Sequence, residues 1–272
     1  MKWSDFNSRV AGFEETRPLP VVAALLDVAV AAGVGALRAT VWDTALYGFV
    51  ATWIFGMSMQ FLPVLLGRTF AHVRTSVFAW YQLSVAAEAL TTAALPVTHP
   101  LRGLASATLA AAALAVVLDL HVFGGARSSA PSSDDGAARF LLTAYGWLLA
   151  GLVCGPGWRT FAAATGSFAP VLAEDFARHA LTLGFLTQMI IGVTSRLVVV
   201  FADRPFWNDR TRLATYWLLN AAVGTRALQV AIAHGAAEAF WPWIALSGPL
   251  AVLALGVFTV TVIRGARPAP AG

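Results

Sequence analysis

The sequence is poor in cysteine and in charged residues. Its 272 residues include one cysteine, Cys154, which excludes an intramolecular disulfide and a zinc or iron–sulfur site built from several cysteines. Charged residues make up 12% of the chain, whereas a water-soluble domain carries roughly 25%. Apolar residues make up 58%, and the mean hydropathy is +0.70. The composition therefore predicts an integral membrane protein whose solvent is the lipid bilayer.

Catalytic signatures are absent as well. The sequence has no phosphate-binding glycine loop, no His-Glu-x-x-His, no Gly-x-Ser-x-Gly and no Cys-x-x-Cys. We therefore expect no turnover of an organic substrate. The net charge of +4 does not indicate nucleic-acid binding, because Lys and Arg lie at the ends of apolar runs, where they orient a membrane protein. The polar first 17 residues or so resemble a cytosolic leader more than a cleaved signal peptide.

Long apolar runs fill most of the chain. A helix needs about 20 mostly apolar residues to cross the hydrocarbon layer. Period-two alternation, which is typical of a membrane barrel, is missing. The sequence therefore predicts an all-α polytopic membrane helix bundle of about eight transmembrane helices. We place them at 20–37, 44–66, 73–96, 103–124, 139–161, 179–201, 212–233 and 239–263.

The basic residues predict the orientation of these helices. With the N-terminus inside, the inner segments contain twelve Lys and Arg residues and the outer ones contain four, Arg38, Arg102, Arg159 and Arg178. An excess of basic residues marks the cytoplasmic side. We therefore expect both termini in the cytoplasm and the protein in the inner (plasma) membrane.

The two halves of the chain resemble each other. Gly48 and Gly56 recur 136 residues later as Gly184 and Gly192, and Arg-Thr recurs at Arg74 and Arg210. We predict two parallel four-helix repeats, at 1–126 and 139–272, joined by a cytoplasmic Ser/Ala/Asp/Gly linker at 127–138. Eight residues turn a helix by close to two full turns, so each glycine pair lies on nearly one face.

The glycine pair at Gly184 and Gly192 has two interpretations. Small residues let membrane helices approach closely, which is the more ordinary explanation. Alternatively, the glycines leave room for a flat cofactor, and we therefore include both among the candidate cofactor-binding residues.

Three histidines are expected near the outer surface. His99 lies between the third and fourth predicted helices, His179 begins the sixth, and His234 ends the seventh. Imidazoles at one membrane depth could ligate haem or copper, or they could be partly hydrated interfacial residues.

Four charged residues within the runs are candidates for ion pairs. Charges inside a membrane are costly, so they usually face protein and are paired. Glu88 and Arg226 have similar expected depth toward the outside, and Asp119 and Arg196 have similar depth toward the inside. We predict these two pairs, which would either tie helices together or line a proton or substrate path.

Part of the sequence resembles a known family. The run His179-Ala-Leu-Thr-Leu-Gly184 and the stretch Ala144-Tyr145-Gly146-Trp147-Leu148-Leu149 resemble segments of NnrS family proteins. The resemblance implies a haem- and copper-containing membrane protein of the nitric oxide response. The family's Leu-Gly-His-Thr-Gly-Arg and early His-x-His-Glu motifs are missing, and Leu142 replaces a family histidine, so only His179 carries over as a ligand. Copper cannot be inferred.

The resemblance implies an NnrS-like protein that binds haem through His179, with a second ligand from His99, His234 or neither, in nitric oxide response or respiratory-chain support. A looser likeness connects the predicted four-helix units with the catalytic subunit of haem–copper oxidases. The alternative is a metal-free permease or scaffold. A homo-oligomer or a respiratory partner subunit is compatible with either hypothesis.

Overall fold

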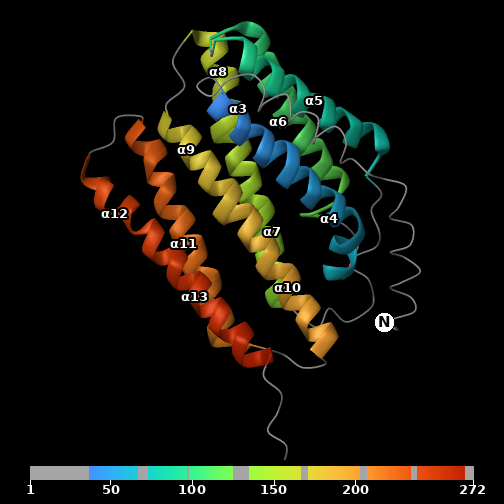
Figure 1. Ribbon diagram of the computed structural model, residues 1–272, viewed down its shortest axis with the longest axis vertical. Helices are drawn as coiled ribbons and strands as arrows, with labels where there is room; N and C mark the ends of the chain where they lie inside the picture. The colour runs from blue at the N-terminus through green and yellow to red at the C-terminus, as the bar shows by residue number, and fades with distance from the viewer. Residues whose placement is uncertain are drawn as a thin grey trace, which may run out of the picture.

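The structure is a computed structural model in which helices account for nearly all of the described chain. It describes residues 37–66, 73–96, 98–124, 135–166, 171–202, 207–233 and 238–266, and these contain no strand. Several helices follow one another without a break and form longer rods (Figure 1). Their bounds are α3 Leu37–Asp43, η2 Thr44–Ala51, α4 Thr52–Leu65, α5 Thr75–Ala94, α6 Pro100–Asp119, α7 Asp135–Leu152, η3 Val153–Gly157, α8 Trp158–Thr165, α9 Val171–His179, η4 Ala180–Leu186, α10 Thr187–Ala202, α11 Asp209–Ala233, η5 Glu238–Phe240, α12 Trp241–Ala245 and α13 Ser247–Ala266.

The rods pack side by side as a bundle. α5 packs against α6, α7 against α10, and α11 against α13. The rod from α7 to α8 and the rod from α9 to α10 lie in the middle, between the α3–α6 group and the α11–α13 group (Figure 1). The two central rods therefore connect the two sides of the molecule.

Seven of the predicted runs, from 44–66 to 239–263, coincide with helices. The run 20–37 lies outside the described residues, except for Leu37. Five helical stretches in the described part are long and apolar enough to cross a membrane: Thr40–Leu62, Pro100–Asp119, Gly136–Thr165, Leu172–Val198 and Trp241–Gly265. These helices confirm the predicted all-helical architecture, with stretches that are long and apolar enough to cross a membrane. The total of eight spans and the two repeats stay predictions.

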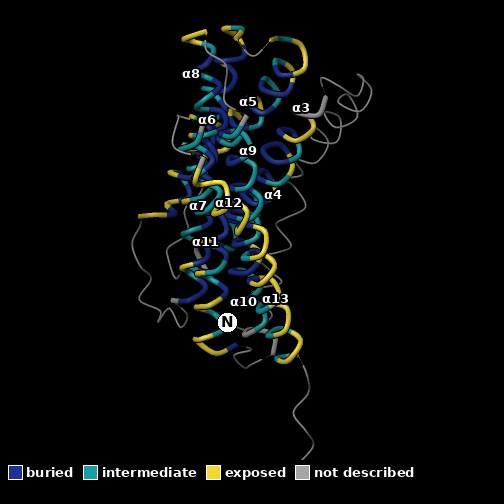
Figure 2. The backbone as a smooth tube through the Cα atoms, turned by 90° about the vertical axis from the view of Figure 1, so that its left-hand side faces the viewer, coloured by how far each residue is buried: buried dark blue, intermediate teal, exposed yellow. Residues whose placement is uncertain are grey.

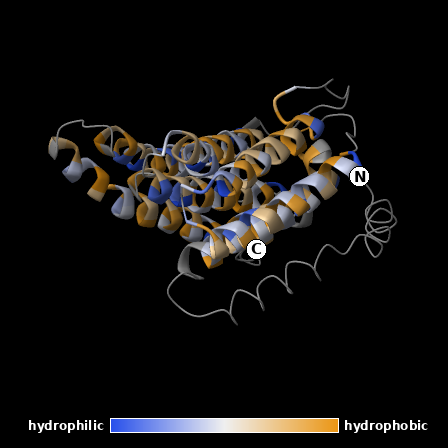
Figure 3. Ribbon diagram, turned by 90° about the horizontal axis from the view of Figure 1, so that it is seen from above, coloured by the Kyte–Doolittle hydropathy of each residue, from blue (hydrophilic) through white to orange (hydrophobic). Residues whose placement is uncertain are grey.

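Large apolar side chains lie on the outside of the bundle, and some polar side chains lie in its interior. Large apolar side chains such as Leu83 and Val252 are 70% and 72% exposed, whereas Gln188 and Ser195 are completely buried. Exposed stretches run along α13, and apolar segments recur along most helices (Figures 2 and 3). Exposed leucine and valine cost nothing in lipid, because the acyl chains are as apolar as the side chains. This pattern identifies the bilayer as the solvent of the bundle.

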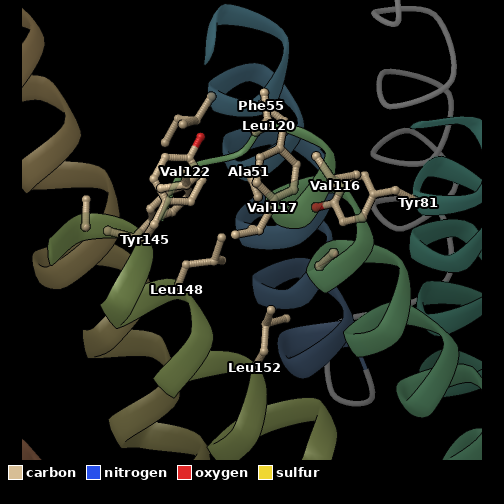
Figure 4. Close-up of a cluster of buried hydrophobic side chains, with 14 of the residues drawn as sticks. Ala51, Phe55, Tyr81, Val116, Val117, Leu120, Val122, Tyr145, Leu148 and Leu152 are labelled. Carbon is tan, nitrogen blue, oxygen red and sulfur yellow. The ribbon is translucent and has the colours of Figure 1, made fainter. Parts of the chain in front are cut away.

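An apolar core joins the first helices to α7. Phe55, Tyr81 and Tyr145 are fully buried there, with aliphatic residues of α6 and α7 around them (Figure 4). The Tyr145 hydroxyl donates to Ser58 Oγ at 2.7 Å, and the Tyr81 hydroxyl donates to the carbonyl oxygen of Tyr47. Both phenol groups therefore have partners, as buried polar groups require.

Three rods contain a wide π-helical segment, η2, η3 and η4, in which the regular hydrogen-bond ladder is interrupted. Pro156 accounts for η3, because proline has no N–H to continue the ladder. In η2 the Tyr47 carbonyl accepts from Tyr81, and in η4 the Thr187 hydroxyl donates to the Thr182 carbonyl at 2.9 Å. Side-chain hydroxyls thus satisfy backbone oxygens in the two segments without proline.

Candidate functional site

A buried guanidinium joins four helices at the end of the bundle where α8 and α9 meet. Arg159 of α8 is 3% exposed, and its Nη1 lies 2.7 Å from Glu88 Oε1 of α5 and 2.7 Å from Asp43 Oδ2 of α3. Its Nη2 donates to Asp43 Oδ1 at 3.1 Å, and its Nε donates to Glu174 Oε1 of α9 at 3.1 Å. We call these four residues, Arg159, Asp43, Glu88 and Glu174, the Arg159 cluster.

Two neighbours hold the Arg159 cluster in place. The Ser106 hydroxyl of α6 lies 2.9 Å from both carboxylate oxygens of Glu88, to which it donates. Arg178 Nη2 lies 3.7 Å from Glu174 Oε2, one helical turn along α9. The prediction that Glu88 pairs with Arg226 is wrong, because Glu88 faces α8 across the bundle and Arg226 lies on α11.

A second polar cluster lies on the neighbouring faces of α9 and α11. Asp175 Oδ2 accepts from Gln229 Nε2 at 2.8 Å, and it lies 3.5 Å from Arg226 Nη1 and 3.5 Å from His179 Nδ1. We call these residues, Asp175, His179, Arg226 and Gln229, the Asp175 cluster. Since Glu174 and Asp175 are adjacent on α9, this helix connects the two clusters into one polar layer.

The geometry of His179 fixes its tautomer. Nδ1 lies 2.8 Å from the backbone carbonyl oxygen of Asp175. A carbonyl oxygen only accepts, so Nδ1 carries a proton, and in the neutral ring Nε2 carries the lone pair. Histidines that bind metals are commonly held in this way, with one nitrogen donating to a carbonyl and the other left for the metal. His179 therefore has the form that ligation requires.

The other two candidate histidines, His99 and His234, give less support to a metal or haem site than His179 does. His99 caps α6, and its Nδ1 accepts from the backbone N–H of Leu101 at 3.2 Å. A helix cap accounts for this residue without a ligand role. His234 lies outside the described residues. The described residues contain no group of three or more His, Cys, Asp or Glu side chains placed to hold a metal ion.

The two candidate glycines pack against α7. A Cβ at Gly184 would lie 2.5 Å from Trp147 Cβ, and a Cβ at Gly192 would lie 3.0 Å from Leu141 Cδ2. Side chains of α7 occupy the space beside both residues, so the close helix approach is the interpretation that the structure favours. We therefore do not include Gly184 and Gly192 in the proposed site.

The predicted inner pair also has a different arrangement. Asp119, at the end of α6, pairs with Arg74, whose Nε and Nη2 both donate to it at 3.0 Å. The predicted pairing of Asp119 with Arg196 is therefore wrong. Arg74 immediately precedes α5, and Asp119 is the last residue of α6. Since α5 and α6 form a helical hairpin, the start of α5 lies beside the end of α6. A comparison of depths alone does not reveal this contact.

An apolar groove lies between α4 and α10. Its volume is about 280 Å³, and Trp53, Met57, Phe61, Met189 and Ile190 are among its lining residues. No titratable side chain lines it. The groove therefore offers contact to apolar groups but no histidine ligand.

Sequence reasoning missed Asp43, Arg159 and Glu174 in the first cluster and Asp175 and Gln229 in the second. Asp43 lies one residue before the run predicted at 44–66, and Glu174 lies before the run predicted at 179–201. Arg159 falls inside the run 139–161 but was assigned to an outer loop. A charge inside an apolar run is a signal for burial, and for Arg159 that signal was present.

Asp43 and His179 have similar positions relative to the π-helical segments. Each residue directly precedes a π-helical segment, η2 and η4, and the two residues are 136 positions apart. The spacing is the same as that of the glycine pairs. The correspondence places one member of each polar cluster at the same point of two similar rods.

Comparison with known proteins gives one finding. The model of a family described as NnrS protein matches residues 9–265, which is nearly the whole chain. No curated protein and no solved structure matches the chain.

Proposed function

Since the chain belongs to the NnrS family, we propose that it is an integral membrane protein of the nitric oxide response that binds haem through His179. The observation that carries this proposal is the hydrogen bond from His179 Nδ1 to the Asp175 carbonyl oxygen, which leaves Nε2 as the ligand atom. The haem iron, when bound, would supply the coordination position for nitric oxide.

The surroundings of His179 suit a group with carboxylates. Arg226 Nε and Gln229 Oε1 are buried and have no hydrogen-bond partner in the described part of the chain. Buried polar atoms without partners call for an explanation, such as a bound group or ordered water. Arg226 would balance the charge of a haem propionate, and Asp175 would hold the imidazole in its ligating tautomer.

We also propose the topology predicted from the sequence: eight spans in two parallel repeats, with both termini in the cytoplasm of an inner-membrane protein. The matching positions of η2 and η4, 136 residues apart, support the repeat. The polar layer then lies toward the outer surface, on the same side as His99 and Arg102.

Replacement of His179 tests the haem proposal. We expect the purified parent protein to show a Soret band, and His179→Ala to lose it, because the substitution removes the ligand atom. Loss of a residue that merely supports a metal ligand costs 10- to 100-fold in affinity, so we expect the haem-to-protein ratio to fall by about tenfold or more. Absorption spectra of oxidised and reduced protein in mild detergent measure this ratio.

His99→Ala is the matched control, because it removes an imidazole from the same end of the bundle. The control should keep the Soret band, because His99 serves as the N-cap of α6. A parent without a Soret band after expression with ample haem would contradict the proposal, and so would a folded His179→Ala protein with the parent's haem content. Gel filtration and circular dichroism establish that both variants are folded.

A further inference from the structure

A pocket of about 260 Å³ lies between the first turns of α7 and α11, at the end of the bundle opposite the Arg159 cluster. Neither polar cluster contributes to it. Two arginine side chains and a tyrosine are among its lining residues, all of which belong to these two helices. They are Gly136, Arg139 and Phe140 of α7, and Asp209, Arg212, Leu213 and Tyr216 of α11.

α7 and α11 run in the same direction, and side chains join them along their length. The rings of Phe140 and Tyr216 lie edge to face with their centroids 5.3 Å apart, and Trp147 Nε1 donates to Asn220 Oδ1 at 2.8 Å. Since the residue numbers increase together in the two helices, both N-termini lie at the pocket. The N–H groups of a helix N-terminus carry a partial positive charge, so these two helix ends add to the attraction of the arginines for an anion.

Gly136 leaves the space that the Arg212 guanidinium group occupies. A Cβ added at Gly136 would lie 2.3 Å from Arg212 Cζ and 2.3 Å from its Nε. Arg212 also donates from Nη2 to Asp209, whose side chain is 89% exposed. A guanidinium group has five N–H donors, and so exposed an ion pair contributes about 1 kcal/mol or less. Arg212 can therefore keep Asp209 as a partner and still donate to an anion in the pocket.

Basic residues outnumber acidic residues at this end of the bundle. α7 packs against α10 and α11 against α13, so that α7 and α11 begin where α10 and α13 end (Figure 1). Within the described residues, these helix ends contain five arginines, Arg139, Arg196, Arg210, Arg212 and Arg264, and two aspartates, Asp135 and Asp209. The region therefore has a net positive charge even when each aspartate is counted against one arginine.

The pocket lies at the level where the apolar stretches end. Gly136 is the first residue of the stretch Gly136–Thr165, and Gly265 is the last residue of Trp241–Gly265. Toward the membrane centre, α11 exposes Leu213 and, one turn later, Trp217, which are 45% and 62% exposed. A phospholipid matches this arrangement, because its phosphate lies at the interface and its acyl chains lie directly below. Inorganic phosphate would make no use of the apolar surface.

We propose that the pocket binds the headgroup phosphate of an anionic phospholipid, whose acyl chains lie against Leu213 and Trp217. Arg139 and Arg212 donate to the phosphate oxygens, and hydrogen bonds between arginine and phosphate are among the strong ones because both partners are charged. Basic pockets between membrane helices are suited to such headgroups. The site lies away from His179, and lipid binding does not depend on haem.

Native mass spectrometry of the full-length protein in detergent tests the site, with phosphatidylglycerol and phosphatidylcholine of the same acyl chains as the added lipids. We expect phosphatidylglycerol to bind more tightly, because phosphatidylcholine carries a quaternary ammonium group that the arginines repel. Combined Arg139→Gln and Arg212→Gln should weaken the binding of phosphatidylglycerol by about tenfold or more, since each basic residue near an anionic lipid adds to the attraction.

Gly136→Ala separates the position of the Arg212 guanidinium group from its charge. The variant keeps every charged residue and displaces only the flexible end of the Arg212 side chain. Alanine also favours a helix more than glycine does, so the variant should fold. We expect it to lose most of the preference for phosphatidylglycerol. Gly146→Ala on the same helix is the matched control and should bind like the parent, because nothing lies within 4 Å of a Cβ added there.

Three outcomes would overturn the proposal. The first is equal binding of the two lipids by the parent, a measurement that needs no variant to fold. The second is a folded Gly136→Ala protein, or a folded double arginine variant, that keeps the parent's preference. The third is displacement of phosphatidylglycerol by an equal concentration of inorganic phosphate, which would assign the pocket to a free anion. Absorption spectra of the same samples report haem separately, so that failure of the haem proposal is recognised on its own.

Discussion

Replacement of Arg159 by methionine is expected to leave little stably folded protein. The substitution keeps much of the side-chain volume but leaves two buried carboxyl groups without their counter-ion. Removal of one partner from a buried ion pair costs about 3–5 kcal/mol, which is a large part of the stability of a typical domain. The yield of monodisperse protein and the temperature of thermal unfolding in detergent measure the effect.

The matched control is Arg178→Met, which removes the same charge from a side chain that is 32% exposed and 3.7 Å from Glu174. Ion pairs near the surface contribute about 1 kcal/mol or less, so this variant should unfold close to the parent temperature. Adding Asp43→Asn and Glu88→Gln to Arg159→Met should recover part of the lost stability, because the orphaned acids are gone. Equal unfolding temperatures of Arg159→Met and Arg178→Met would refute the central role of Arg159.

Replacement of Gly184 by alanine is expected to destabilise the central pair of rods. The added Cβ would lie 2.5 Å from Trp147 Cβ and 2.6 Å from Trp147 Cγ, closer than real Cβ contacts. Trp147 Cβ is bonded to the backbone of α7, so rotation of the side chain cannot relieve that contact and the rods must separate. Overpacking of this kind costs about 1–3 kcal/mol. Thermal unfolding measures the loss.

Gly224→Ala is the control for the glycine variant, because nothing lies within 4 Å of a Cβ added at that helical position. It should leave the unfolding temperature unchanged or slightly raised. If Gly184→Ala unfolds at the same temperature as this control, α7 and η4 are not in close contact in the protein.

The helices could be predicted from the sequence because the bilayer imposes a simple rule. Any crossing segment needs a long apolar run, and seven such runs coincide with helices. Their ends were less predictable. α9 begins at Val171, eight residues before the predicted start, because Glu174, Asp175 and Arg178 lower the local hydropathy although their partners lie within the bundle.

The partners of the charged residues could not be predicted in this way. The expected depth in the membrane suggested the pairs, but residues at one depth can lie on opposite sides of a bundle. Glu88 meets Arg159 because α6 packs against both α5 and α8, whereas Arg226 meets Asp175 because α11 packs beside α9. Choosing between such partners requires the lateral order of the helices, which hydropathy does not contain.

The positions of η2 and η4 bear on how the chain originated. A π-helical turn accommodates one more residue than an α-helical turn, so each segment corresponds to a single-residue insertion. Two independent insertions need not fall 136 residues apart, whereas duplication of one ancestral unit that already contained the wide turn explains both. Under the proposed duplication, the residue before that turn is Asp43 in the first repeat and His179 in the second. One position would then bear a carboxylate that pairs with Arg159 in the first repeat and the proposed haem ligand in the second.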